Sequence, residues 1–255
     1  MLDAKLMFAN PENGGFTDAQ CLSALTRMNW IAQRWAEKGR RQVVGALNAN
    51  PARTLPLLLQ VAVESGDPIG WIAASWLEKL AEPKIAMLIR NQLPEQTIAL
   101  RELAATVTAL LLETASDEAE KAVFLNNLAI RLSDLGRREE ALNAAEKAVR
   151  IYRQLAQARP DAFLPDLAMS LNNLANFLSG LGRREEALSA AEEAVRMLRP
   201  SFLQLPDAWA HNMLVMCRVY LKACEELEAE LDTELLRPIV ETLQKLQAEV
   251  QPGPL

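Results

Sequence analysis

Histidine, cysteine and aromatic residues are scarce in this sequence of 255 residues. Because His211 is the one histidine, a His-based zinc site, a Ser-His-Asp triad or a Cys-His dyad would have to use it. The three cysteines are too few, and odd in number, for a disulfide framework, which favours a reducing, cytoplasmic compartment. The sequence also lacks a run of about 18 apolar residues and a secretion signal, so we expect no membrane association.

Signals for phosphate and nucleic-acid binding are missing as well. No glycine-rich loop of the G-x-x-x-x-G-K type occurs. The formal net charge is −6 and no basic stripe compensates for it locally, which argues against nucleic acid as a partner. Alanine and leucine dominate while alternating β-branched runs are nearly absent, so an all-α fold is predicted. We therefore expect a protein with no catalytic residues, no metal site and no cofactor.

An internal repeat of 26 residues organises the rest of the chain. The segment 125–150 returns at 171–196, an offset of 46 residues, with 21 of the 26 aligned positions identical. A helical unit that repeats at such a period cannot bury its apolar face alone, so it must stack on a neighbour. The repeat therefore predicts an α-solenoid.

Each copy of the repeat predicts two helices joined by a tight turn. In the first copy, leucine and alanine recur at helical spacing until Gly136, a residue type that commonly follows a helix in the left-handed conformation. The next helix has an alanine-rich stripe that allows close packing. These positions resemble the tetratricopeptide repeat. The matching residues are Leu125, Leu128, Ala129, Leu132, Gly136, Ala141, Ala145 and Ala148 in the first copy, and Leu171, Leu174, Ala175, Leu178, Gly182, Ala187, Ala191 and Ala194 in the second.

The resemblance implies a right-handed α-α superhelix of antiparallel helix pairs. The period exceeds the family's basic unit of about 34 residues, which is similar to the extended repeats of kinesin light chains and of many bacterial multidomain proteins. A decayed third copy starts at Pro206 and is expected to cap the stack. The predicted organisation is an irregular lead at 1–16, an irregular helical region at 17–115, two extended repeats at 116–205, a degenerate third repeat with a capping helix at 206–250, and a disordered tail at 251–255.

The region before the repeats predicts helices without a clear period. Thr17 followed by Gln20 has the spacing of a capping box, and it predicts a helix that runs to about Lys38 and ends before Gly39. Four tryptophans lie in this region as two similar pairs, and we expect their side chains to anchor the core. They are Trp30, Trp35, Trp71 and Trp76.

The resemblance also implies a binding groove. In this family the first helix of each pair lines the concave wall, and positions between its packing residues contact a bound peptide. Those positions here are Asn126, Ile130, Ser133 and Asp134 in the first copy, and Asn172, Asn176, Ser179 and Gly180 in the second. Asn127 and Asn173 adjoin them and are included in the predicted groove. An asparagine amide both donates and accepts, so a ladder of amides would hold an extended segment. The alternative is that the asparagines bond within the superhelix.

The sequence therefore predicts a non-enzymatic scaffold or adaptor that binds a peptide or protein partner in its groove. Similar repeats in bacteria are fused to effector domains of signalling and defence proteins, which implies a regulatory subunit of such a system. The alternative is a regulator that senses a small ligand or a signal peptide. Chaperone C-terminal tails are disfavoured as partners, because Ile130, Val215 and Val219 stand where that family's clamp needs asparagine, lysine and arginine.

Overall fold

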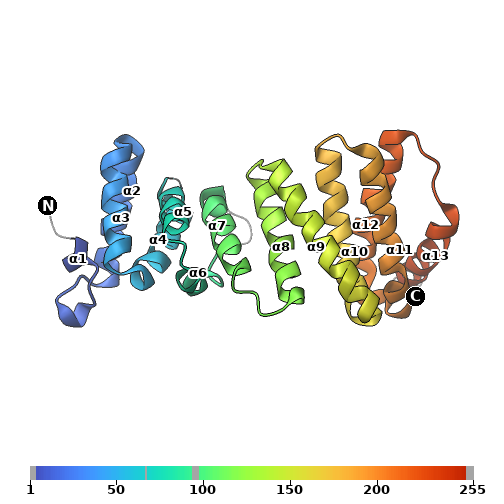
Figure 1. The fold of residues 1–255 in the computed structure, drawn as a ribbon, viewed down its shortest axis with the longest axis horizontal. Helices are drawn as coiled ribbons and strands as arrows, with labels where there is room; N and C mark the ends of the chain where they lie inside the picture. The colour runs from blue at the N-terminus through green and yellow to red at the C-terminus, as the bar shows by residue number, and fades with distance from the viewer. Residues whose placement is uncertain (1–3, 67, 94–97, 251–255) are drawn as a thin grey trace, which may run out of the picture. The chain divides into compact units, whose positions relative to one another are not determined.

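The computed structural model describes residues 4–66, 68–93 and 98–250 (Figure 1). Helices dominate these ranges, which contain no strand, so the predicted all-α class is confirmed. No helix within the same ranges is both long enough and apolar enough to cross a membrane. The tail predicted at 251–255 lies outside the described residues.

The chain divides into two compact units, and the first, residues 1–115, consists of short helices of unequal length. Its elements are α1 (Ala4–Met7), η1 (Pro11–Asn13), α2 (Asp18–Arg34), α3 (Ala36–Ala49), α4 (Pro51–Ser65), α5 (Ile69–Leu80), α6 (Pro83–Ile89), η2 (Ile98–Leu100) and α7 (Arg101–Leu112). Helix α2 packs on α3 and α4, α1 packs on α3, and α5 packs on α7. The lead predicted as irregular at 1–16 contains α1 and η1.

The boundary between α2 and α3 differs from the predicted one. The capping box is confirmed, because Gln20 N donates to Thr17 Oγ1 and the Gln20 side-chain oxygen accepts from Thr17 N at 2.8 Å. The helix, however, ends before Trp35, whose φ of −139° and ψ of 80° interrupt it. Gly39 lies inside α3, where a Cβ atom would come within 2.4 Å of the Ala32 Cβ on α2. The glycine therefore permits close approach of two helices. The sequence alone predicts a helix end at this residue, because glycine commonly has that local role.

The prediction that the tryptophans of the first unit anchor its core is wrong for three of the four. Trp76 is buried, and its Nε1 donates to Asn48 Oδ1 at 2.8 Å. Trp30, Trp35 and Trp71 are 58%, 52% and 49% exposed. Trp30 packs edge to face on Trp35 with ring centroids 5.9 Å apart, and arginine guanidinium groups lie over the rings of Trp35 and Trp71. Large aromatic side chains are often only partly buried, so helical position alone does not place them in a core.

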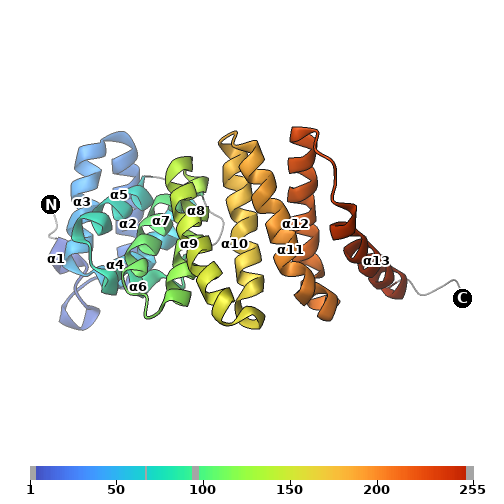
Figure 2. The ribbon, with the colours of Figure 1, turned by 45° about the vertical axis from the view of Figure 1, so that its right-hand side comes forward.

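The second unit, residues 116–255, is a stack of helix pairs. Its helices are α8 (Glu118–Asp134), α9 (Arg138–Ala158), α10 (Pro160–Gly180), α11 (Arg184–Gln204), α12 (Pro206–Leu227) and α13 (Thr233–Val250). Each helix contacts the next along the chain. In addition, α8 contacts α10, α10 contacts α12, and α11 contacts α13 (Figure 2). The first helices thus form a continuous row, with the second helices packed beside it, which confirms the predicted solenoid.

Tight turns join the helices of the first two pairs. Gly136 has φ +74° and Gly182 has φ +77°, a region that glycine enters without steric strain. In the first turn, Arg137 N donates to Leu132 O and Gly136 N donates to Ser133 O, both at 2.9 Å. The equivalent two bonds close the second turn. This Schellman motif satisfies the carbonyl groups at the helix end and reverses the chain direction, as the repeated glycine predicts.

In the third pair, α12 with α13, the end of α12 keeps the equivalent two backbone bonds, from Glu228 N to Glu225 O and from Ala229 N to Cys224 O, and side-chain contacts then hold the start of α13. Glu228 follows α12 in the left-handed region with φ +51°. Asp232 caps α13 by accepting from Leu235 N at 2.9 Å, and it also accepts from the Arg196 guanidinium of α11 at 2.8 Å. The Tyr220 hydroxyl of α12 accepts from Asp232 N at 3.1 Å. These bonds connect the start of α13 to both preceding helices.

Candidate functional site

The predicted groove residues lie on α8 and α10, the first helices of the first two pairs. The two helices contact each other in the row that α8, α10 and α12 form. Residues 46 apart therefore occupy equivalent positions on neighbouring helices. The structure separates the predicted residues into a set that faces solvent and a set that lies between helices.

The solvent-facing set forms a stripe of amide and apolar side chains, which we name the outer stripe; all are exposed except the half-buried Asn173. It consists of Val123, Asn127, Ile130 and Asp134 on α8, and Met169, Asn173 and Asn176 on α10. Spacings of three and four residues place the members on one side of each helix. Val123 and Met169 are 45% and 42% exposed. Sequence reasoning missed these two because they precede the repeated segment, although each lies one helical turn before a predicted asparagine.

The Asn126 side chain lies between α8 and α10 and is not part of the outer stripe. Its Nδ2 donates to Ser170 Oγ of α10 at 2.5 Å, and Ser170 is fully buried. This bond matches the alternative stated for the asparagines, a role within the superhelix. Asn126 Oδ1 is buried and has no partner among the described residues. Ser170 could not be identified from the repeat, because the equivalent residues are Phe124 and Met216.

Asn172 occupies the position equivalent to Asn126 but has different surroundings. It is 8% exposed, and its Oδ1 is likewise buried without a partner in the described part of the chain. Where Asn126 meets Ser170, the equivalent residue one repeat later is Met216, whose thioether is only a weak acceptor. Two asparagines in the same local sequence therefore differ in their cross-helix contacts.

The remaining predicted residues lie toward the C-terminal ends of α8 and α10. Ser179 is half-buried, and its Oγ donates to Glu226 Oε2 on α12 at 3.2 Å. The equivalent bond cannot form from Ser133, because the residue equivalent to Glu226 is Gly180, which has no side chain. Asn176 Nδ2 donates to the Asn172 carbonyl of its own helix at 3.1 Å, which leaves the Asn176 amide oxygen available.

The nucleophilic and metal-binding side chains are dispersed. Among the described residues, no group of three or more His, Cys, Asp and Glu side chains could hold a metal ion. Cys21, Cys217 and Cys224 are free cysteines. Burial raises the pKa of the Cys217 thiol to about 11 and also raises the pKa of Cys21. Both are therefore protonated thiols at neutral pH, the form that is a poor nucleophile.

Comparison with known proteins identifies the repeated segment. Residues 122–160 and 167–199 each match the tetratricopeptide repeat family model. A bifunctional glutamine synthetase adenylyltransferase/adenylyl-removing enzyme of Xanthobacter autotrophicus is 34% identical over 96 residues, which cover 33% of this chain and 9% of that enzyme. The matched stretch is thus a small part of the relative.

Proposed function

We propose that this chain, which carries two tetratricopeptide repeats, is a non-enzymatic scaffold that binds a peptide or protein partner along the outer stripe. One observation carries the proposal: an exposed apolar residue followed by an amide recurs on two contacting helices. The pairs are Val123 with Asn127, and Met169 with Asn173. Buried leucine and alanine already pack these helices, so the solenoid itself does not need the exposed pattern.

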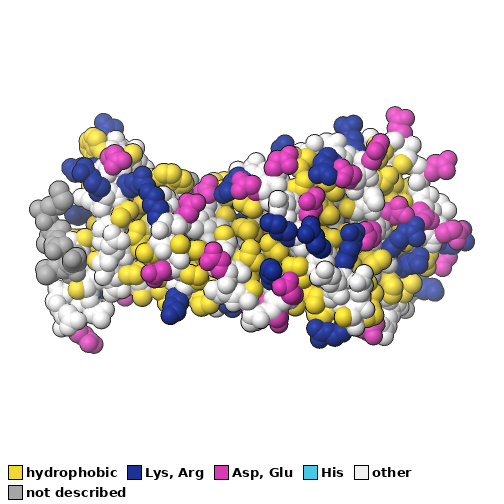
Figure 3. Space-filling model, viewed as in Figure 1, with side chains coloured by type: hydrophobic (Ala, Val, Ile, Leu, Met, Phe, Trp, Pro, Cys, Tyr) yellow, Lys and Arg dark blue, Asp and Glu magenta, His cyan; other side chains and the backbone are white. Residues whose placement is uncertain are grey.

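The chemistry of the outer stripe suits an extended segment. The amides of Asn127 and Asn173 can each donate to a main-chain carbonyl and accept from a main-chain N–H. Val123, Ile130 and Met169 supply apolar surface beside those amides for side chains of the partner. On the face of the second unit shown in Figure 3, acidic and basic side chains lie interspersed, and neither sign of charge dominates.

We assign different roles to the residues that the sequence grouped together. Asn127, Ile130, Asn173 and Asn176 are partner contacts, with Asp134 at the end of the stripe. Asn126, Asn172 and Ser179 are positioning residues of the solenoid, because the first two lie between helices and Ser179 bonds to the next pair. Ser133 lacks the equivalent bond and is assigned no role.

The resemblance to bacterial repeat proteins supports a role as regulatory subunit of a signalling or defence system, and the free cysteines fit a cytoplasmic location. The alternative is a regulator that senses a ligand or a signal peptide. The two differ in what the second unit retains, a protein in the first case and a small molecule or short peptide in the second.

Affinity capture with substituted chains tests the assignment. The full chain, immobilised and exposed to lysate of its native host, is compared with the triple variant Asn127→Ala, Asn173→Ala, Asn176→Ala by quantitative mass spectrometry. The matched control is Asn143→Ala, which removes an exposed asparagine from the second helix α9. We expect one partner to be captured in stoichiometric amount by the wild type and the control, and at least tenfold less by the triple variant.

Equal capture by the triple variant would refute the outer stripe as the contact surface. If no protein is captured in stoichiometric amount and a small molecule or short peptide is bound, the scaffold hypothesis is rejected and the sensing regulator is supported. Circular dichroism of each variant confirms that helical content is unchanged, which is expected because the substituted side chains are not buried.

A further inference from the structure

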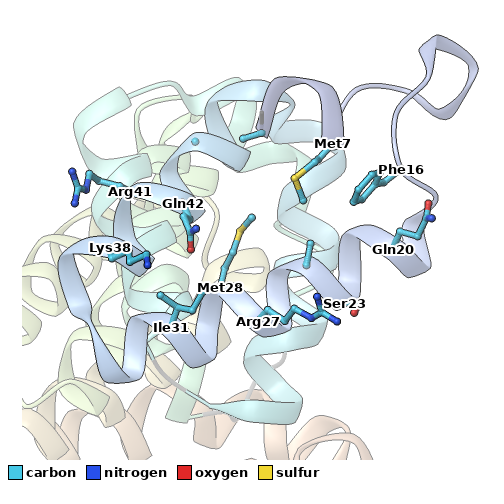
Figure 4. A pocket seen from close by; sticks show the side chains of 13 residues that line it. Met7, Phe16, Gln20, Ser23, Arg27, Met28, Ile31, Lys38, Arg41 and Gln42 are labelled. Carbon is cyan, nitrogen blue, oxygen red and sulfur yellow. The ribbon is translucent and has the colours of Figure 1, made fainter. Parts of the chain in front are cut away.

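We infer that a cavity in the first unit binds a small organic anion that has an apolar body and a hydrogen-bond donor. The cavity has a volume of about 890 Å³ and lies between α1, α2 and α3 (Figure 4). Its apolar wall includes Met7 of α1, Phe16, and Met28 and Ile31 of α2. This site is separate from the outer stripe, which lies in the second unit.

The size and lining match a small-molecule site. Ligand pockets typically enclose about 300–1,000 Å³ and are mainly apolar with a few polar groups. An α-helix about 10 Å across fills about 850 Å³ in two turns, so a helical peptide would be held over two turns only. Met7 and Met28 are flexible and polarisable, which allows the wall to adapt to an apolar body.

The charged residues of the lining define the sign of the ligand. Arg27, Lys38 and Arg41 line the cavity, and no aspartate or glutamate is among its described lining residues. Within the described ranges these three cations form no ion pair or hydrogen bond. Arg53 of the same unit shows the contrast, because its guanidinium is paired with Asp18 at 2.8 Å. Unpaired cations on the two helices that line the cavity favour a sulfonate, phosphate or carboxylate.

An orphan acceptor in the same cavity defines a second ligand group. Gln42 lines the cavity, and its Oε1 is buried with no partner among the described residues. A buried acceptor without a donor is unfavourable, so rotation of the Gln42 amide toward the cavity would let Oε1 accept from a ligand N–H or O–H. Figure 4 shows Lys38 and Gln42 of α3 on the side of Met28 of α2, whereas the Arg41 guanidinium extends from α3 toward the rim. The anion and the donor of the ligand would therefore lie near α3, and the apolar body against α2.

Two fluorescent probes of one shape separate the contribution of the charge. 8-Anilino-1-naphthalenesulfonate has an aromatic body, an N–H donor and a sulfonate, and N-phenyl-1-naphthylamine has the same body and donor without the sulfonate. We expect the purified full chain to bind the sulfonate with one-to-one stoichiometry and at least tenfold more tightly than the neutral probe. Equal affinity for the two probes would overturn the anion assignment.

Substitutions locate the bound probe. The triple variant Arg27→Gln, Lys38→Gln, Arg41→Gln should lower the affinity for the sulfonate at least tenfold and leave the neutral probe unaffected. The matched control Lys79→Gln, Lys84→Gln, Arg90→Gln removes the same number of exposed cations from the same unit, outside the cavity, and should bind like the wild type. Equal loss in both triple variants would mean that net charge and not the cavity attracts the probe, which would overturn the proposal.

A cavity-filling variant provides the second check. Ala24 of α2 lines the cavity and is half-buried, so Ala24→Phe should occupy the space and reduce binding of both probes at least fivefold while the melting temperature is retained. Full binding by Ala24→Phe would place the probe elsewhere and reject the site. If the melting temperature of Ala24→Phe falls, the comparison of the two triple variants tests the location of the probe instead. The outcome is independent of the partner capture above, because every substitution lies in the first unit.

Discussion

The hydrogen bond between Asn126 and Ser170 gives the sharpest test of how the solenoid is held together. Asn126→Ala removes this bond of 2.5 Å and leaves the Ser170 hydroxyl, which is fully buried, without a partner. An orphaned buried hydroxyl costs about 1–3 kcal/mol, and removal of the unpartnered Asn126 Oδ1 offsets part of this, so we expect a net loss of about 1–2 kcal/mol. Ser170→Ala should lower the stability by as much or more, because both the nitrogen and the oxygen of the Asn126 amide would then lack a partner.

The double variant Asn126→Ala, Ser170→Ala distinguishes this bond from general packing. With both polar partners replaced, its stability should return to within about 1 kcal/mol of wild type, a coupling of about 1–3 kcal/mol in a double-mutant cycle. Two single variants serve as controls. Asn127→Ala, at an exposed position, should change stability by less than about 0.5 kcal/mol. Asn172→Ala should be neutral or stabilising, because it removes a buried oxygen that has no partner among the described residues.

The measurement must report on the second unit alone, since the chain has two compact units. Native-state hydrogen exchange, read by mass spectrometry on peptides from α8 and α10, gives the local free energy of opening in the full-length protein. Additive losses in the double variant would show that the two side chains act independently, and equal losses for Asn126→Ala and Asn172→Ala would show that sequence position alone sets the role. Either result would refute the argument.

Four further substitutions test the backbone and one thiol. Gly39→Ala places a Cβ within 2.4 Å of Ala32 and should destabilise the first unit by about 1–3 kcal/mol in urea denaturation, whereas Gly180→Ala, which meets nothing within 4 Å, should not destabilise the second. Gly136→Ala should cost about 1–2 kcal/mol through backbone strain at φ +74° alone, because its Cβ also meets no atom within 4 Å, and thermal melting would measure the loss. Burial raises the pKa of Cys217 from 9.0 to about 11, so the folded state holds this proton more tightly than the unfolded chain and its contribution to stability is intact below pH 9 and is lost as the pH rises toward 11. The fall in stability between pH 9 and pH 11 should be smaller in Cys217→Ala, and an identical pH profile would contradict the assignment.

The repeated segment shows how far local signals extend. Apolar residues at helical spacing and a glycine at a helix end are properties of neighbours in the chain, so the helix pairs around Gly136 and Gly182 were predictable. The same reasoning failed at Gly39, where a glycine serves an approach between α2 and α3 and lies inside a helix. It also failed for Trp30, Trp35 and Trp71, whose exposure depends on which helices meet there.

The sequence by itself determined the all-α class, the stride of 46 residues and the stacking of helix pairs, because each follows from periodicity within one segment. Only the tertiary structure decided which asparagine does what. Asn126 and Asn172 share the surrounding sequence Leu-Asn-Asn-Leu-Ala, yet one meets a buried serine on the next helix and the other does not. The structure likewise assembled the cationic cavity of the first unit from three helices. The partner of a side chain across a helix interface depends on how two segments pack, so the local sequence of one repeat does not determine it.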